Sequence, residues 1–175
     1  MQLGEEINVF GNWFIIHFTE NYGMAFGLEF GGEAGKIILT VVRIIACCGI
    51  GWYIFYLIRK KVHQGLVISM SFILAGALGN IIDSVFYGVI FSDSLFQVAE
   101  FMPASGGYDG FWHGRVVDMF YFPIIEGQFP QWFPFWAGEP FLFFRPVFNI
   151  ADASITTGVA LIVIFQKRFF AGLAH

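Results

Sequence analysis

Charged residues are scarce in this sequence, at 13% of 175 residues, whereas soluble domains average about 25%. Three motifs are absent as well: the H-E-x-x-H zinc motif, the G-x-S-x-G nucleophile motif and a glycine-rich phosphate loop. These absences argue against a zinc protease, a serine hydrolase and a nucleotide-binding enzyme. Hydrophobic residues reach 57%, which indicates a membrane protein.

Metal and nucleic-acid sites are also poorly supported. The four histidines are scattered along the chain, so we predict no metal site and no cofactor. The formal charge is −4 and there is no basic patch, which argues against a nucleic-acid partner. Cys47 and Cys48 are adjacent in an apolar run, so we interpret them as small core residues.

Three stretches are long enough to cross a bilayer, which takes about 20 residues of helix. We predict transmembrane helices at 36–58, 66–91 and 146–168. Basic residues lie in the short link between the first two helices and after the third, so both of these regions are predicted to be cytoplasmic. The segments on either side of the first two helices, 1–35 and 92–145, are then extracytoplasmic.

The extracytoplasmic segments carry structural signals of their own. Residues 8–33 alternate between apolar and polar side chains and contain the turn signal "NYG", which predicts a small β-sheet with a hairpin at that turn. Residues 129–144 are rich in Trp, Phe and Pro, so we expect an irregular aromatic belt at the level of the lipid headgroups. The predicted fold is a single domain, 1–175, built as a membrane all-α bundle with an extracytoplasmic sheet.

Two copies of Asn-x-x-Asp interrupt the most apolar parts of the chain. Asn80 and Asp83 lie near the outer end of the second helix, about 26 Å along it, and Asn149 and Asp152 lie near the start of the third. Residues three apart are neighbours on a helix. We therefore expect two polar faces that meet across a helix interface.

Asp118 and Arg43 are expected in the outer leaflet of the membrane, in the same layer as Asp83 and Asp152. Ionisable groups at such depth are costly and suggest a function. Two close carboxyl groups share one proton, so one can activate water while the other donates to a carbonyl oxygen. Three alternatives remain open: a structural Asp83–Arg43 ion pair, a transporter or proton relay that uses buried carboxylates, and a structural subunit of a larger complex.

Four motifs resemble those of the lipoprotein signal peptidase family, also called signal peptidase II. They are "ENYGMAFG" (20–27), "GNIIDS" (79–84), "GRVVDMF" (114–120) and "FNIADASI" (148–155). The resemblance covers most of the chain and implies an aspartyl endopeptidase of the bacterial inner membrane, with its active site facing outward. It implies that Asp118 and Asp152 are catalytic. Further residues are expected to bind substrate: Asn21, Asn80, Asp83, Asn149, Arg115 and Arg43.

The resemblance also implies the partners. The substrate would be a lipidated prolipoprotein, cut just before the diacylglyceryl cysteine of its lipobox, and globomycin-like peptides would inhibit. We expect a monomer surrounded by membrane lipid. Two features depart from the family pattern. Ser84 stands where many members have Arg, so Arg43 or Arg115 is expected to replace that charge. The family has four spans, whereas this chain opens where the first would end, so we expect three.

Overall fold

Three long helices and a small antiparallel sheet make up the computed structural model, which describes residues 1–21, 32–123, 125–143 and 146–171. The helices are α1 (Gly32–Arg59), α2 (Gln64–Ile90) and α3 (Ile150–Phe170). Within the described residues, all three are long and apolar enough to span a membrane. The chain is therefore a multi-pass membrane protein, and the predicted fold class is confirmed.

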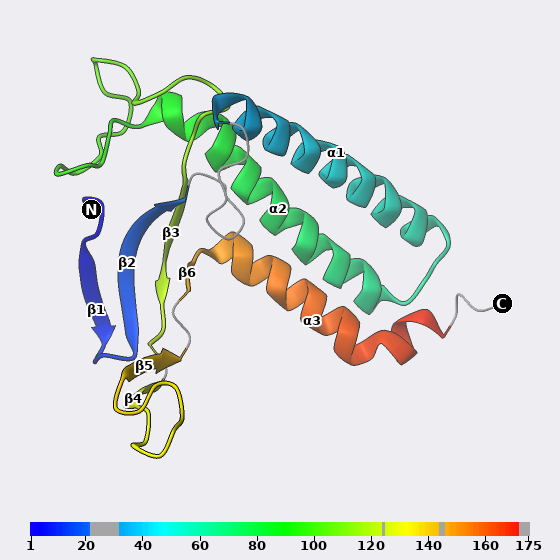
Figure 1. Cartoon of the computed structure of the whole chain (residues 1–175). Coiled ribbons are helices and arrows are strands. Elements are labelled where there is room, and N and C mark those ends of the chain that lie inside the picture. Colours follow the sequence, from blue (N-terminus) through cyan, green and yellow to red (C-terminus); the bar gives the residue numbers. More distant parts are fainter. Residues whose placement is uncertain (22–31, 124, 144–145, 172–175) are drawn as a thin grey trace.

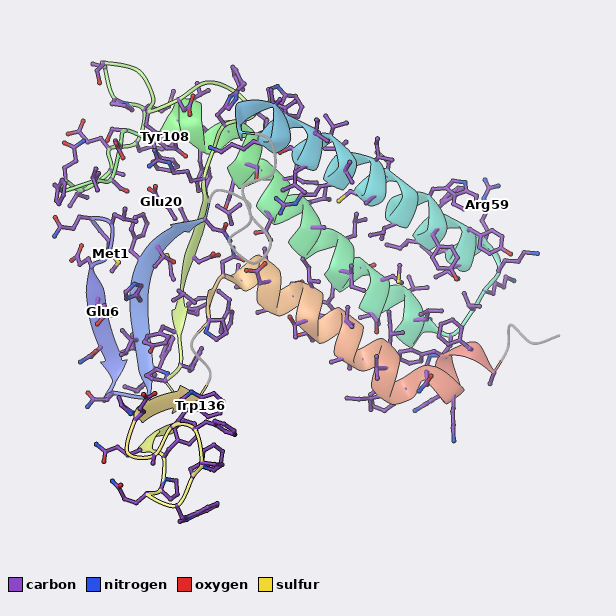
Figure 2. The ribbon with its side chains drawn as sticks, in the orientation of Figure 1. Met1, Glu6, Glu20, Arg59, Tyr108 and Trp136 are labelled. Carbon is purple, nitrogen blue, oxygen red and sulfur yellow. The ribbon has the colours of Figure 1, made fainter. Side chains whose placement is uncertain are left out.

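The helices lie side by side with α2 in the middle, and the sheet lies at one end of the bundle (Figure 1). We call this end the sheet end and the opposite one the link end, because residues 60–63 join α1 to α2 there. Figure 2 shows Arg59 at the link end, far from Glu20 and Tyr108 at the sheet end.

Small residues allow α2 and α3 to pack closely. A Cβ added at Gly76 would lie 2.2 Å from the backbone oxygen of Ala151, and one added at Gly158 would lie 2.5 Å from that of Ser69. Ser154 adds a hydrogen bond by donating to the Phe72 carbonyl at 2.7 Å. Close backbone approach of this kind is typical of helix pairs in membranes.

The main sheet has the order β1–β2–β3–β6, with every neighbouring pair antiparallel. Its strands are β1 (Glu6–Phe10), β2 (Phe14–Asn21), β3 (Val116–Tyr121) and β6 (Val147–Phe148). β1 and β2 form a hairpin whose turn lies at residues 11–13, where Gly11 has a φ of +53° that glycine adopts readily. The predicted turn at "NYG", and the rest of 22–31, lie outside the described residues.

A second hairpin was missed. β4 (Ile125–Gln128) and β5 (Pro140–Phe143) pair antiparallel, where we expected an irregular belt. Proline is compatible with this strand because Pro140 is its first residue. The third helix also begins later than predicted, at Ile150, because 147–148 pair with β3 instead.

Candidate functional site

Asn149 organises the junction between the sheet and α3. Its side-chain oxygen accepts the backbone N–H of Asp152 at 2.9 Å, and its own backbone N–H donates to the Asp152 carboxylate at 3.5 Å. This reciprocal pair is a capping box, which satisfies the free N–H groups at a helix start. Asn149 is thus the N-cap of α3, not a residue on its helical face as we predicted.

The side-chain amide of Asn149 connects the Asp118 carboxylate to a second amide, that of Asn80. Its Nδ2 donates to Asp118 Oδ1 at 2.8 Å and to Asn80 Oδ1 at 3.1 Å. The amide of Asn80 in turn donates to Asp152 Oδ1 at 2.8 Å. A continuous chain of hydrogen bonds therefore runs from Asp118 through the two amides to Asp152. We call these four residues the carboxylate–amide network.

The network confirms that the two Asn-x-x-Asp segments meet across the α2–α3 interface. Across this interface the Asn80 amide of α2 donates to the Asp152 carboxylate of α3. Asp83 lies one turn further on and faces the Tyr87 hydroxyl and the backbone N–H of Val117. Tyr87 was missed, although its position four residues after Asp83 places it on the same helix face.

Asp118 reaches the site on β3. The chain returns along α2 before this strand, with the backbone N–H of Gly114 donating to the Ser84 carbonyl at 2.9 Å. A Cβ at Gly114 would lie 2.1 Å from the Asp83 carbonyl oxygen, so glycine permits this approach. The β2–β3 register shifts between Ile16 and Thr19, next to Asp118. Such irregularities commonly redirect a side chain beside an active site.

The Asp118 carboxyl lies in a protected environment, since the residue is 6% exposed. Burial first, and the nearby Asp152 charge second, raise the pKa of Asp118 to about 6. Hydrogen bonds with the side chains of Asn21 and Asn149 act in the opposite direction. Asn21, the last residue of β2, is therefore part of the site. A carboxyl group with this pKa holds a proton at a higher pH than an ordinary aspartic acid does.

The two arginines occupy different places. Arg43 on α1 lies within electrostatic reach of Asp152 and lines a small cavity with Ser84, Lys36 and Trp112. It therefore brings a positive charge close to Ser84. That Arg43 or Arg115 replaces the charge of the family's Arg stays a prediction.

Arg115 belongs to a separate group beside the network. Its guanidinium donates to Glu20 at 2.7 Å and to Asp93 at 3.3 Å, and it lies 4.6 Å from the ring centroid of Tyr108. The Tyr108 hydroxyl accepts the backbone N–H of Arg115 at 2.7 Å, and burial raises the pKa of Tyr108 to about 12. Three members of this group, Glu20, Tyr108 and Arg115, line a cavity of about 260 Å³. Its walls also include Tyr87 and Val117, the two partners of Asp83. Sequence reasoning missed Glu20 and Asp93.

The fold and the site define a multi-pass membrane protein with paired carboxyl groups at one end of its helices. The model of the family "Signal peptidase (SPase) II" matches residues 1–168. The chain therefore belongs to the signal peptidase II family and is a membrane protease. This assignment confirms the resemblance and favours a peptidase over the transporter and subunit alternatives.

Related proteins agree with the assignment. The chain is 52% identical over 169 residues to a lipoprotein signal peptidase of Porphyromonas gingivalis, covering 96% of this chain and 73% of that protein. It is 40% identical to a lipoprotein signal peptidase of Amoebophilus asiaticus, covering 95% and 68%. A solved bacterial membrane enzyme superposes with a TM-score of 0.54 at 25% identity, covering 96% of this chain and 74% of that one.

Proposed function

We propose that the chain removes signal peptides from lipidated prolipoproteins by an aspartyl mechanism, cutting just before the lipobox cysteine that carries diacylglycerol. The observation that carries the proposal is the carboxylate–amide network. It holds Asp118 and Asp152, from β3 and α3, on one pair of bridging amides at the end of the spanning helices. A peptide bond next to a lipid-anchored cysteine would be presented at this level of the membrane.

In the proposed reaction, Asp118 and Asp152 share one proton and bind one water. The ionised carboxylate removes a proton from the water, whose oxygen attacks the scissile carbonyl carbon, while the protonated carboxyl donates to the carbonyl oxygen. The C–N bond then breaks as the amine nitrogen of the cysteine receives the proton taken from water. A hydroxyl of the tetrahedral intermediate returns the other proton to the carboxylate that donated it, which leaves a new carboxyl group on the signal peptide and restores the shared proton. The raised pKa of Asp118 favours the shared proton. Asn80 and Asn149 keep both carboxyl groups in position.

Other residues receive binding roles in this proposal. Asn21 and Asn149 lie against Asp118 and are placed to contact the peptide backbone. Arg115 lines the cavity described above, which we assign to peptide side chains near the cut. Asp83 bonds two residues of its wall, Tyr87 and Val117. Arg43 balances negative charge near Asp152. Globomycin-like peptides are expected to compete for the same site.

The experiment uses the full chain in lipid nanodiscs with a prolipoprotein that carries diacylglycerol. We expect a shortened product on a gel and a mass that places the cut before the modified cysteine. The same prolipoprotein without lipid is the control, and it should remain uncut. Equal cleavage of both forms would contradict the lipid requirement. If the chain binds the lipidated prolipoprotein, and Asp152→Asn weakens this binding, but no cleavage occurs, the hydrolytic role would be contradicted.

We also propose that the link end faces the cytoplasm of a bacterial inner membrane and that the site faces outward, because the basic residues Arg59, Lys60 and Lys61 gather at the link. A His63→Cys variant lacking Cys47 and Cys48 tests this in intact spheroplasts. We expect no reaction with an impermeant thiol reagent added outside. Labelling from outside would show that the link end faces outward and would contradict the proposed orientation.

A further inference from the structure

The β4–β5 hairpin ends in a compact aromatic turn, residues 129–139, which we call the hairpin tip. Two backbone hydrogen bonds of 2.9 and 3.0 Å close it, from Gly138 to the Phe129 carbonyl and from Glu139 to the Trp136 carbonyl. The rings of Phe129, Phe133 and Trp136 pack on one another with centroids 5.0 to 6.0 Å apart. The tip therefore has a defined shape.

The outer face of the tip is mainly aromatic, and its one charged residue, Glu139, stands at the end next to β5. Trp132 is 79% exposed, Phe135 81% and Trp136 50%, and residues 127–138 contain no charged side chain. Exposed, contiguous aromatic surface is unusual for a face in water and marks an interaction site. Tryptophan in particular is enriched where a protein crosses the boundary between lipid and water.

The chain holds the hairpin near the membrane boundary. β5 ends at Phe143 and β6 begins at Val147, and four residues reach at most about 14 Å. β6 is followed directly by Asn149, the cap of the spanning helix α3. Figure 1 shows the hairpin to the side of the sheet end of the helices, not further out along their axes, and Figure 2 shows Trp136 in this hairpin.

A group of packed rings holds the chain just before the hairpin against the main sheet. Phe122, three residues before β4, lies 4.7 Å from Phe14, 6.3 Å from Trp13 and 5.8 Å from Phe148, measured between ring centroids. Phe148 belongs to β6, beside the cap of α3. The position of the tip is therefore coupled to the strands that carry the site.

We propose that the hairpin tip inserts into the lipid–water interface on the sheet side of the membrane, with Trp132, Phe135 and Trp136 among the headgroups and the first acyl carbons. The partner is the bilayer itself, because residues 127–138 carry no charge and the chain leads from the hairpin through β6 to the spanning helix α3. The tip would hold the neighbouring strands β3 and β6 at a fixed depth relative to the membrane, and Asp118 on β3 with them.

The test measures tryptophan depth in the full chain in phosphatidylcholine nanodiscs. Replacing Trp13, Trp52 and Trp112 by Phe leaves only the two tip tryptophans, Trp132 and Trp136. Quenching is measured with lipids spin-labelled at acyl carbon 5 or 12 and with acrylamide in the water. A matched variant that retains only Trp52, which is exposed on the spanning helix α1, reports on correct insertion.

We expect the tip tryptophans to lose more fluorescence with the carbon-5 label than with the carbon-12 label, to be shielded from acrylamide and to emit at shorter wavelength than free tryptophan. Full acrylamide access without lipid quenching would overturn the proposal, and so would stronger quenching by the carbon-12 label. If the tryptophan variants misfold, a polarity-sensitive dye on Phe135→Cys in a Cys47→Ala, Cys48→Ala chain answers the same question. None of these readouts depends on proteolysis.

Discussion

The two ends of the α2–α3 pair differ in their side chains: one end is polar and the other is apolar. At the sheet end, buried polar groups meet: Asp118 and Asn149 are 6% and 9% exposed and bridge to Asn80 and Asp152. At the link end, Leu66 of α2 and Phe169 of α3 form an apolar cluster with Leu57 of α1, and these residues are 0 to 5% exposed. One pair of helices thus has a hydrogen-bonded end and a closely packed end.

This difference indicates a division of labour. Apolar packing suits a membrane helix pair without further explanation, whereas buried carboxyl groups in the membrane are costly and are kept where they serve a function. We therefore expect substitutions at the sheet end to reduce hydrolysis more than stability. Substitutions at the link end should do the reverse.

The largest effect is expected from Asp152→Asn, which keeps the size of the side chain but removes its ability to act as a base. Loss of one acid–base group lowers a rate by about 10²–10⁴-fold. Asp83→Asn is the matched control, because Asp83 faces Tyr87 and Val117 outside the network, and it should lower the rate less. Initial rates of prolipoprotein cleavage measure both, and equal losses would contradict the assignment of Asp152.

Leu66→Ala should destabilise the link end by about 2–3 kcal/mol, since Leu66 is 1% exposed and its truncation leaves a cavity. Leu78→Ala, on the same helix but 44% exposed, is the control and should cost much less. Thermal unfolding in nanodiscs measures stability, and cleavage by the folded fraction should stay near wild type. A rate loss as large as that of Asp152→Asn would break the division between the two ends.

Glycine substitutions locate the same division along the interface. Gly158→Ala and Gly76→Ala both place a methyl group against the backbone of the opposite helix, and overpacking typically costs about 1–3 kcal/mol. Of these two substitutions, only Gly76→Ala places its methyl group against Ala151, next to Asp152. Only Gly76→Ala should therefore also slow cleavage. Gly49→Ala, where nothing lies within 4 Å, should leave stability and rate unchanged.

The smallest effect concerns the pH dependence of stability. The pKa of Asp118 is raised from 3.8 to about 6, so between these values the folded state holds more protons than the unfolded state. Its stability therefore falls as pH rises through this window. Asp118→Asn carries no charge, so it should gain stability relative to wild type from pH 4 to pH 7, on the order of 1–3 kcal/mol. Unfolding temperatures of both proteins across pH test this, and a constant difference would contradict it.

Sequence reasoning reached the helices and the main polar residues because each has a local signal. The spans follow from apolar length, and Asn80, Asp83, Asn149 and Asp152 follow from polar residues in apolar runs. The cap at Asn149 was missed although N-x-x-D before an apolar run is a helix-start signal. Reading that signal would have moved the start of the third helix to Ile150.

Other features depend on contacts between distant parts of the chain. The pairing of β2 with β3, which brings Asn21 to Asp118, joins residues almost one hundred apart, and no local pattern specifies it. The hydrogen bond from Asn80 to Asp152 depends on how α2 crosses α3. The aromatic hairpin was missed because three prolines between 129 and 144 suggested irregular backbone, although they lie in the tip and at the start of β5.

The proposed mechanism requires Asp118 and Asp152 to act as one unit, and a double-mutant cycle tests this most directly. Cleavage rates are measured for wild type, Asp118→Asn, Asp152→Asn and the double variant, all folded in the same lipid. We predict that each single change costs about 10²–10⁴-fold and that the double variant is about as slow as the slower single variant, because groups that act together are not additive. Losses that multiply in the double variant, or a single variant close to wild type, would contradict the shared catalytic role.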